Sequence, residues 1–353
     1  MRITFSVYGC ATKPIGGHKV IYEMANRLSA GGHEVTIVFS SQGNLYQLPF
    51  PAAVRVLICR ILTYTGILPG WFRFSKKVRL KTVNGFDERF FPEADAVIAT
   101  ARITAEPVSE LPACKGKKYY LIQDFEDWDC TAQEVTATYQ LGMTNITIAK
   151  WLRDLVQQYD AHRTLYLPNA IDSGIFCIKR PVEDRHAHVI GLLYHTAEHK
   201  GLKYSFEALD MVKRQYPDTV VKIFGTAKRP PELPEWYEYH YRLQPEELCE
   251  LYNACSVFLC GTVEEGFGLT GAESMACGCA FVSTDYKGVH EYAVDHENVL
   301  LSPIRDPAAL AEHVIYLFEH EQERTRLALA GAEAVNKRNW DYVIRCMEGF
   351  LNQ

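Results

Sequence analysis

The sequence lacks any apolar run of about 18 residues, the length that a membrane span needs. Its 11 cysteines include no CxxC pair, and Cys277 and Cys279 are too close together for a usual zinc knuckle. The N-terminus, MRITFSVYGC, has the pattern of a buried strand that runs into a glycine loop, which is not the pattern of a signal segment. These absences predict a cytoplasmic protein with reduced thiols, either soluble or peripheral at the inner face of the membrane.

An excess of positive charge is also missing, because the formal net charge is −6. We therefore expect no nucleic-acid partner. Acidic residues, in turn, are absent between Val35 and Phe86, where seven cations occur: Arg55, Arg60, Arg73, Lys76, Lys77, Arg79 and Lys81. With the aromatic stretch WFRF and the apolar run RVLICRILTY, these cations suit either an anionic acceptor, such as a lipid phosphate, or an anionic membrane contacted through residues 55–81. A solvated basic loop is the third interpretation.

A chain of 353 residues is long for one domain, and its pattern of strands and helices repeats. The first forty residues read as a strand (RITFSVY), a glycine turn, an amphipathic helix (KVIYEMANRLSAGGH) and a strand (EVTIVFS). Val20, Ile21, Met24 and Leu28 have helical spacing, and two glycines follow them. This pattern predicts a βαβ unit of a parallel sheet, with ADAVIAT and KYYLIQD as further strands. Residues 45–86 fit no single element.

The pattern breaks after YLPNAID into the polar segment KRPVEDRHAH, where we place a domain boundary. The alternation of strand and helix then begins again, with VIGLLY, TVVKIFG, SVFLCG and CAFVST as strands. The predicted domains are residues 1–170 and 171–335, and a C-terminal helix within 336–353 is expected to pack back on the first domain. Doubly wound α/β domains bind ligands at the carboxyl ends of their strands, so we expect the active site in a cleft between the two.

The stretch EEGFGLTGAES, residues 264–274, follows the predicted strand SVFLCG and opens a helix. Gly266 and Gly268 allow a ligand to approach the backbone closely, and the N–H groups at a helix N-terminus can receive a phosphate. Glu265 in the loop and Glu273 on the helix offer carboxylates as acceptors for sugar hydroxyls. The alternative is that both glutamates are solvated surface residues.

This stretch resembles the motif of two glutamates separated by seven residues in the retaining glycosyltransferases of family four, or group 1 glycosyl transferases. The segment DYKGVHEYAVDHENVLLSPIRDPAALAEHV is similar to the family's sequence after that motif. YLPNAID resembles its interdomain crossing, and GGHKVIYEMANRLSAGGHEVTIV resembles its first βαβ unit. The resemblance implies an α/β protein of GT-B fold, with two doubly wound, Rossmann-like domains that face a central cleft. The N-terminal domain would bind the acceptor and the C-terminal domain the nucleotide sugar.

The resemblance also implies roles for individual residues. Glu273 would bind the ribose hydroxyls of the donor, and Glu265 the hydroxyls of the transferred sugar. Lys200 would neutralise the departing diphosphate, with a plain surface lysine as the alternative. We take Glu265 and Lys200 as the catalytic residues. The residues that would lie along the diphosphate and the sugar are Phe267, Gly268, Leu269 and Thr270.

Two positions depart from the family's pattern. Gly191 is followed by Leu192, where the family often has a phosphate-binding arginine, and His195 is the nearest candidate to replace it. At the end of the strand KYYLI the family commonly has a histidine that faces the donor sugar, whereas this chain has Gln123 followed by Asp124. We expect these two residues on the acceptor side of the cleft.

Gly16 and Gly17 form a second glycine loop at a helix start, where a tight turn explains them about as well as a ligand does. We expect them on the acceptor side too. No GxGxxG pattern accompanies them, which argues against a dehydrogenase. Neither a cofactor nor a metal is expected, and the donor substrate is a nucleoside diphosphate sugar, with UDP slightly favoured.

The sequence therefore predicts a retaining, metal-independent glycosyltransferase of polysaccharide or glycolipid synthesis at the cell surface, with a glycan or lipid-linked acceptor. A sugar-nucleotide epimerase or hydrolase on the same fold is one alternative, because a fold does not determine a reaction. A non-catalytic partner of another transferase is the second alternative.

Overall fold

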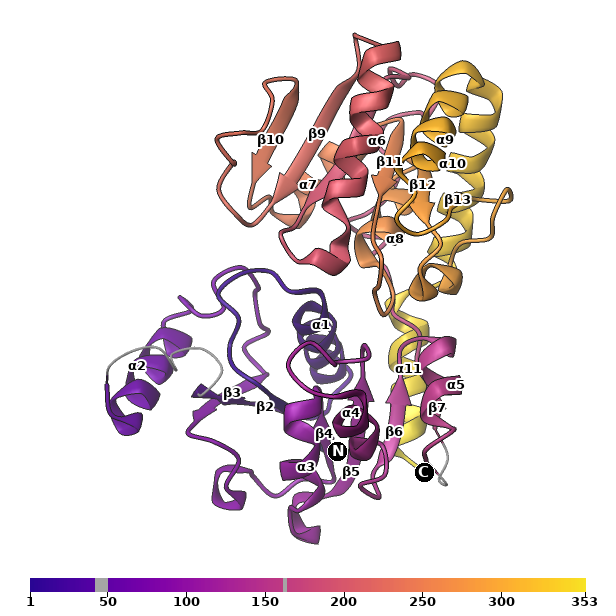
Figure 1. The fold of residues 1–353 in the computed structure, drawn as a ribbon. Coiled ribbons are helices and arrows are strands. Elements are labelled where there is room, and N and C mark those ends of the chain that lie inside the picture. The colour runs from indigo at the N-terminus through magenta and orange to yellow at the C-terminus, as the bar shows by residue number, and fades with distance from the viewer. Residues whose placement is uncertain (42–49, 161–163) are drawn as a thin grey trace. The chain divides into compact units, whose positions relative to one another are not determined.

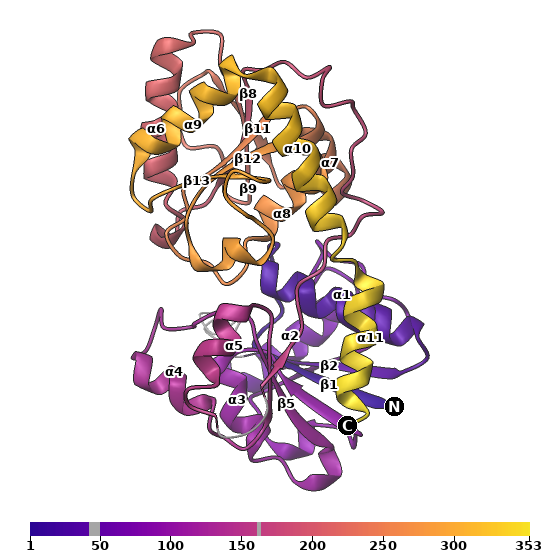
Figure 2. The same ribbon diagram turned by 90° about the vertical axis from the view of Figure 1, so that its right-hand side faces the viewer.

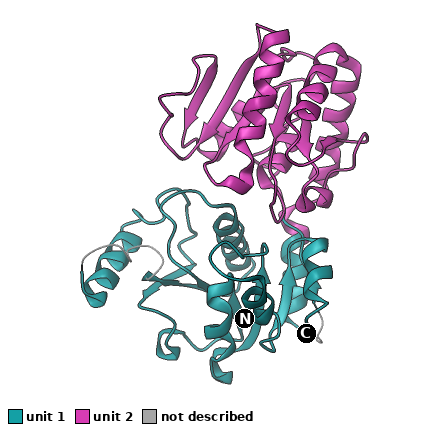
Figure 3. Cartoon of the chain, viewed as in Figure 1, with its two compact units in different colours: residues 1–169, 343–353 teal, residues 170–342 magenta. Residues whose placement is uncertain are grey.

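The structure is a computed structural model that describes residues 1–41, 50–160 and 164–353. The chain divides into two compact units (Figures 1 and 3). Unit 1 comprises residues 1–169 and 343–353, and unit 2 comprises residues 170–342. Two pieces of predicted segments lie outside the described residues, namely 45–49 of the unassigned region and Arg163 at the start of RTLYLPNAID.

Unit 1 is built on a parallel sheet with the described strand order β3-β2-β1-β4-β5-β6-β7. The strands are β1 (Arg2–Val7), β2 (Glu34–Ser40), β3 (Arg79–Val83), β4 (Ala96–Ala99), β5 (Lys117–Ile122), β6 (Thr144–Thr147) and β7 (Leu165–Tyr166). The helices are α1 (Gly16–Ala30), α2 (Ala52–Tyr64), α3 (Arg102–Ser109), α4 (Ala132–Thr138), α5 (Lys150–Val156) and most of α11 (Trp340–Leu351). Strand order reverses between β1 and β4, which is where doubly wound sheets bind ligands.

The predicted βαβ unit at the start of the chain is confirmed as β1, α1 and β2. The predicted apolar face of α1 is buried, and the helix ends at Gly31, followed by Gly32 with a φ of +93°. Strands β4 and β5 confirm the predictions for ADAVIAT and KYYLIQD. All four residues of β4 are buried, as expected for a central strand of a parallel sheet that is covered on both faces.

The region that fitted no single element contains a helix and an edge strand. Helix α2 contains the whole apolar run RVLICRILTY, and β3 pairs in parallel with β2. The segment between them, residues 65–78, has no helix or strand but contacts α1 through the Asn26 side chain, which donates to Arg73 O at 3.0 Å and accepts from Ser75 N at 2.8 Å. Sequence periodicity did not separate these three pieces.

Unit 2 repeats the architecture with the described strand order β10-β9-β8-β11-β12-β13, all in parallel pairs. Its strands are β8 (Val189–Tyr194), β9 (Val220–Gly225), β10 (Tyr237–Tyr241), β11 (Val257–Cys260), β12 (Ala280–Thr284) and β13 (Leu300–Ser302). Its helices are α6 (Leu202–Gln215), α7 (Pro245–Asn253), α8 (Leu269–Ala276), α9 (Pro307–Glu319) and α10 (Glu321–Asn336). The order reverses between β8 and β11, which places the ends of these two strands at the switch point.

Helices cover both faces of the unit 2 sheet. Helices α6 and α9 pack together on one face, and α7, α8 and α10 lie on the other (Figure 2). The core on the α6 side includes Leu209, Val212 and Val314, all fully buried. The four predicted strands of this unit are confirmed as β8, β9, β11 and β12.

The tail of the chain forms the predicted helix, α11. From Val343 onward it belongs to unit 1, where Val343, Met347 and Leu351 are buried. Its polar contacts with unit 1 include an ion pair between His33 Nε2 and Glu348 Oε1 at 3.0 Å and a hydrogen bond from Tyr119 Oη to Phe350 O in the last turn. Among the described residues, no helix combines the length and apolar character needed to cross a membrane.

Candidate functional site

The loop between β11 and α8 carries the stretch EEGFG and leads into the N-terminus of α8. Gly268 is the N-cap of α8 with a φ of +92°, a conformation that side chains rarely adopt. A Cβ at this position would lie 2.0 Å from the hydroxyl of Tyr286, so the site also has no room for a side chain. The tight turn leaves the first N–H groups of α8 without intrahelical acceptors and directed toward the loop, as phosphate sites require.

Glu265 and Lys200, the two predicted catalytic residues, form an ion pair. Their Oε1 and Nζ atoms are 2.7 Å apart, and the side chains are only 21% and 18% exposed. Lys200 ends a 3₁₀ turn, Glu198–Lys200, between β8 and α6, whereas Glu265 follows β11. Strands β8 and β11 are neighbours at the switch point, which is why residues 65 positions apart in sequence can meet (265 − 200).

The Lys200 turn and the Glu265 loop are held together by backbone contacts. The N–H groups of Val263 and Glu264 both donate to His199 O, at 2.8 and 3.3 Å. Gly201 has a φ of +59°, and a Cβ there would lie 1.8 Å from Gly261 O. The two segments therefore approach so closely that only glycine fits, and the ion pair rests on this backbone junction.

Glu273 lies in the second turn of α8 and is 5% exposed. It stands four and three residues after Leu269 and Thr270, so it shares a helix face with the first turn. The alternative of a solvated surface glutamate is therefore wrong for this residue. Burying a carboxylate is costly unless polar groups surround it, so the position of Glu273 is unusual for a glutamate.

The other residues predicted to bind the sugar donor differ in which of their groups are accessible to a ligand. The Phe267 ring is buried against Tyr292, with ring centroids 5.1 Å apart, so only the backbone of Phe267 remains to line a site. Leu269 and Thr270 are partly exposed at the start of α8, where both the N–H groups and the Thr270 hydroxyl are available as donors. The structure thus brings Lys200, Glu265 and the first turn of α8 to one edge of the unit 2 sheet.

His195 directly follows β8 and lies in the same connection from β8 to α6 as Lys200. Burial and the nearby charge of Lys200 lower the pKa of the His195 imidazole, while Glu265 opposes that shift. The His195 Nδ1 atom accepts from Ala197 N at 3.1 Å, so the neutral ring carries its proton on Nε2 and can donate there. Leu192 stands at the position where the family often has a phosphate-binding arginine. Its side chain is apolar and buried in the core, so it cannot bind a phosphate.

The predicted acceptor-side residues lie in unit 1, at the carboxyl edge of its sheet. Gly17, in the first turn of α1, lies against Gln123, which follows β5; a Cβ on Gly17 would be 3.2 Å from Gln123 Nε2. The Gln123 Oε1 atom is buried with no hydrogen-bond partner among the described residues. Asp124 accepts from Phe125 N at 2.9 Å. Gly16 begins α1, whose N-cap provides no side-chain hydrogen bond.

Sequence reasoning missed Glu126 and Arg102 at this edge. Glu126 Oε2 accepts from Arg102 N at 2.7 Å, and burial raises the pKa of the Glu126 carboxyl while Arg102 opposes the rise. Arg102 Nη2 also pairs with Asp129 at 2.6 Å. The sequence does show an acidic run, DFEDWD, directly after a predicted strand. That this run lies near the start of α3 depends on the order of strands in the sheet, which the sequence does not give. Among the described residues, no cluster of three or more metal-ligating side chains occurs.

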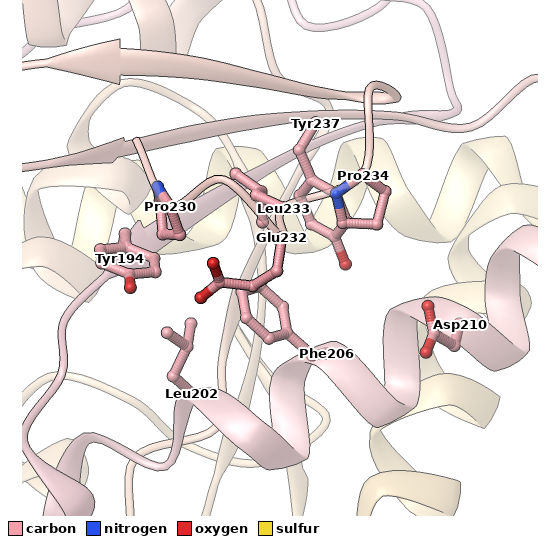
Figure 4. Close-up of a pocket in the computed structure, with 9 residues that line it drawn as sticks. All are labelled: Tyr194, Leu202, Phe206, Asp210, Pro230, Glu232, Leu233, Pro234 and Tyr237. Carbon is pink, nitrogen blue, oxygen red and sulfur yellow. The ribbon is translucent and has the colours of Figure 1, made fainter. Parts of the chain in front are cut away.

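A separate pocket of about 220 Å³ lies between α6 and the connection from β9 to β10 (Figure 4). Figure 4 shows the Glu232 carboxylate near Leu202 and Phe206, with Tyr194 at one end and Asp210 on α6 at the other. The walls are mainly apolar and aromatic. None of the predicted site residues lines this pocket, which lies on the α6 face, whereas Glu273 lies on α8 on the other face.

One known protein family matches most of unit 2 in sequence. Residues 180–334 match the family described as Glycosyl transferases group 1. A D-inositol 3-phosphate glycosyltransferase of Xylanimonas cellulosilytica is 33% identical over 109 residues, 31% of this chain and 26% of that protein. An N,N'-diacetylbacillosaminyl-diphospho-undecaprenol alpha-1,3-N-acetylgalactosaminyltransferase of Campylobacter jejuni is 28% identical over 139 residues, 38% of this chain and 36% of that protein. The aligned stretches thus span about a quarter to a third of these relatives' length.

Solved structures resemble the whole chain. Sucrose-phosphate synthase from Thermosynechococcus elongatus superposes with a TM-score of 0.75 over 100% of this chain and 98% of that one, at 14% identity. HepE from Anabaena, solved with UDP and glucose, gives a TM-score of 0.75 over 100% and 99%, also at 14% identity. These likenesses establish the GT-B fold. Residues 180–334 therefore belong to the group 1 glycosyl transferases, in a chain that has the GT-B fold.

Proposed function

We propose that this chain is a retaining glycosyltransferase, which moves a sugar from a nucleoside diphosphate sugar to an acceptor hydroxyl. The observation that carries the proposal is the ion pair of Lys200 and Glu265 beside the N-terminus of α8, with Glu273 buried in the next turn. A cation, a row of helix N–H groups and two carboxylates are the groups that a diphosphate and its two sugars need.

Each group has a distinct role in donor binding. Glu273 accepts hydrogen bonds from the ribose hydroxyls, and Glu265 accepts them from the transferred sugar. The backbone of Phe267, Gly268 and Leu269 and the Thr270 hydroxyl donate to the diphosphate and the sugar. Lys200 exchanges its contact with Glu265 for the diphosphate, and His195 donates from Nε2 in place of the arginine that Leu192 replaces.

The chemistry follows from the charges at the site. The bond between the anomeric carbon and the phosphate oxygen breaks, and the sugar develops oxocarbenium character as negative charge grows on the diphosphate. Lys200 and the N-terminus of α8 stabilise that growing charge. The acceptor hydroxyl attacks from the same face, and its proton passes to the departing phosphate oxygen. Neither a dedicated base nor a metal takes part in this scheme.

We propose that unit 1 supplies the acceptor side, through Gly16, Gly17, Gln123 and Asp124. The unpartnered Gln123 Oε1 supports this assignment, because a buried amide oxygen gains stability from a donor such as a hydroxyl. The acceptor is a glycan or a lipid-linked glycan of cell-surface synthesis; the name of the Campylobacter jejuni relative describes a lipid-linked acceptor. We place the enzyme in the cytoplasm, as the cysteine pattern predicts.

The first donor to test is a UDP-sugar. UDP is the nucleotide in the structure of HepE, and a TarM mutant of the same fold was solved with UDP and alpha-GlcNAc-glycerol. A thermal-shift screen of UDP, GDP and ADP identifies the base, because a ligand that binds only the folded state raises the melting temperature.

Product analysis with the selected nucleotide sugar tests the function. A transferase forms a glycosylated acceptor with the anomeric configuration of the donor, which NMR of the product reads directly. Isomerisation of the nucleotide sugar, or its hydrolysis in the presence of acceptor, identifies the alternative epimerase or hydrolase. Nucleotide binding without turnover on any acceptor of a lipid-linked and soluble panel identifies a non-catalytic partner and overturns the proposal.

A further inference from the structure

Helix α2 of unit 1 presents an apolar stripe to solvent. Val54, Leu57, Ile61 and Tyr64 are 39%, 57%, 53% and 93% exposed, and they repeat at intervals of three and four residues, which aligns them on one helix face. Phe50 precedes the helix with 47% of its surface exposed. Single exposed apolar residues are common, but a row along a helix marks a binding surface.

The other face of α2 is firmly attached to the fold. Val56, Cys59 and Thr63 are buried, and α2 packs against β3. The hydroxyls of Thr63 and Thr82 are 3.4 Å apart, and Arg60 Nε donates to Thr82 O at 3.0 Å. The outer stripe is therefore held in a fixed orientation, and rotation of the helix to hide it would break these contacts.

The aromatic residues that follow α2 are not part of this surface. Trp71, Phe72 and Phe74 pack around Tyr22 of α1, with ring centroids 5.5, 5.2 and 4.7 Å from it. Trp71 Nε1 also donates to Ala11 O at 2.8 Å. The aromatics anchor residues 71–75 on α1, and the intervening charged side chain of Arg73 is left exposed.

The sequence on both sides of α2 carries charge of one sign. No acidic residue occurs between Val35 and Phe86, and Arg60, Arg73, Lys76 and Lys77 are exposed. Within the described ranges, the last three have no carboxylate at ion-pair distance. Of the seven cations between Val35 and Phe86, only Arg79 has a carboxylate at ion-pair distance among the described residues, that of Glu34 at 3.7 Å between two exposed side chains.

We propose that α2 is a membrane-docking element that inserts Val54, Leu57, Ile61 and Tyr64 into the interface of an anionic lipid bilayer. Amphipathic helices with an apolar stripe and flanking cations lie in this way at the boundary between headgroups and acyl chains. The cations reach the lipid phosphates, whose negative charge complements the cations of this acid-free stretch of sequence. A second copy of this chain is a poorer occupant, because a symmetric contact would bring the same cations together. The inference goes beyond the proposed function and does not depend on it.

Sedimentation with vesicles tests the proposal without any donor or acceptor. We expect the full chain to sediment with vesicles of equal parts phosphatidylglycerol and phosphatidylcholine at low salt, and to stay in solution with phosphatidylcholine alone. Leu57→Ser/Ile61→Ser should lower the partition coefficient at least about tenfold, because two inserted side chains are lost. Lys76→Ser/Lys77→Ser should lower it by about tenfold or more through the loss of two lipid-facing charges.

Matched variants in unit 2 control for general effects of charge and polarity. Lys228→Ser/Lys337→Ser removes two exposed lysines, and Leu329→Ser removes an apolar side chain that is 45% exposed. Both should bind vesicles like the unaltered chain. All altered residues are exposed, so circular dichroism should show unchanged folding.

Three results would overturn the proposal. The first is that the unaltered chain stays in solution with anionic vesicles at low salt. The second is that the Leu57→Ser/Ile61→Ser variant sediments with these vesicles as well as the unaltered chain does. The third is a dimer in sedimentation equilibrium that Leu57→Ser/Ile61→Ser dissociates. The last outcome assigns the stripe to self-association. A Tyr64→Trp variant adds an independent reading: we expect an increase in blue-shifted fluorescence with anionic vesicles, and quenching by brominated lipid acyl chains.

Discussion

At the scale of single residues, the buried carboxylate of Glu273 allows a direct test of the proposed ribose site. We predict that Glu273→Ala weakens nucleotide binding about 5- to 150-fold, which corresponds to about 1 to 3 kcal/mol for ribose hydroxyls that lose a buried partner. Isothermal titration calorimetry measures the change, with circular dichroism to confirm folding. Glu264→Ala removes an exposed neighbour and should leave affinity unchanged. Equal affinity of the Glu273 variant and the unaltered chain would remove Glu273 from the ribose site.

Lys200 is predicted to act chiefly on turnover. Lys200→Ala should reduce kcat on the order of 100- to 1000-fold, since the charge that it stabilises grows as the diphosphate departs. The melting temperature should change by only a few degrees because the pair with Glu265 is partly solvated. Lys203→Ala, on an exposed lysine three positions on, is the control and should turn over normally. Normal kcat in the Lys200 variant would make that residue a surface cation.

His18 predicts a dependence of stability on pH. Burial lowers the pKa of its imidazole from 6.5 to about 4, and its Nδ1 has no partner among the described residues. Between these values the unfolded chain binds more protons than the folded one. The stability due to neutral His18 is therefore complete above pH 6.5 and is lost as pH falls toward 4, by at most about 3 kcal/mol.

Urea unfolding at pH 7 and pH 5 measures this loss. His18→Phe keeps a ring beside Tyr22, whose centroid is 5.7 Å from that of His18, but cannot titrate. The variant should lose less stability between the two pH values than the unaltered chain. The same loss in both proteins would show that other groups carry the acid sensitivity.

At the scale of elements, the contact between the Lys200 turn and the Glu265 loop rests on Gly201. We predict that Gly201→Ala destabilises unit 2 by more than about 1 kcal/mol, the minimum cost of a left-handed residue with a side chain. The variant should also lose nucleotide affinity, because the Cβ would displace Gly261 O and with it the Glu265 loop. Differential scanning calorimetry and nucleotide titration measure the two effects.

Gly349 provides the matched control for that substitution. It lies within α11, and a Cβ there meets nothing within 4 Å. Gly349→Ala should therefore stabilise the chain by about 0.5 to 1 kcal/mol through helix propensity alone. A Gly201 variant that behaved like the Gly349 variant would contradict the close approach of the two backbones.

The elements differ in how far the sequence could predict them. Central strands such as β4 and β11 are short, uniformly apolar runs, because burial on both faces demands it, and they were predicted. In the edge strand β10, with the sequence YEYHY, only the first residue is buried, and β3 begins with three exposed or half-buried residues before its two buried ones. Because edge strands are only partly buried, their sequences lack the continuous apolar run that predicts a buried strand. The helical period of α2 was not recognised because apolar residues occur on both of its faces.

The residues of the candidate site also differ in how far the sequence could predict their positions. Gly268 and Glu273 could be predicted because a strand, a glycine turn and a helix follow one another in the chain. The pairing of Lys200 with Glu265 could not, since it depends on β8 and β11 becoming neighbours. The position of Glu126 beside the start of α3 depends likewise on the order of strands. Local sequence encodes the geometry of a turn, whereas contacts across strands require the topology.

At the scale of the whole molecule, unit 1 depends on residues that follow unit 2 in the chain. Removing residues 343–353 exposes the sites of Val343, Met347 and Leu351, each worth about 1.5 to 3 kcal/mol when buried. This total is comparable to the net stability of a domain, so we predict that the truncated chain has an unfolded or strongly destabilised unit 1. Unit 2 should remain folded and bind nucleotide.

Hydrogen exchange read by mass spectrometry distinguishes the two units. Peptides from β1 and β4 should lose protection in the truncated chain, whereas those from β8 and β11 should keep it. Removal of Asn352 and Gln353 alone, both exposed, is the control and should change neither set. Full protection of β1 after removal of 343–353 would show that α11 is dispensable for unit 1.

The same arrangement sets the order in which the units can mature during synthesis. Unit 2 is continuous, so all of its residues have been translated once the ribosome has passed Tyr342. Unit 1 begins first but is completed last, because its buried Met347 and Leu351 are translated only after unit 2. The N-terminal unit therefore cannot finish folding before the second unit has been translated, unlike the usual vectorial order in which the N-terminal domain finishes first. Until its final helix emerges, the nascent N-terminal half carries uncovered apolar surface and is the part that chaperones must protect.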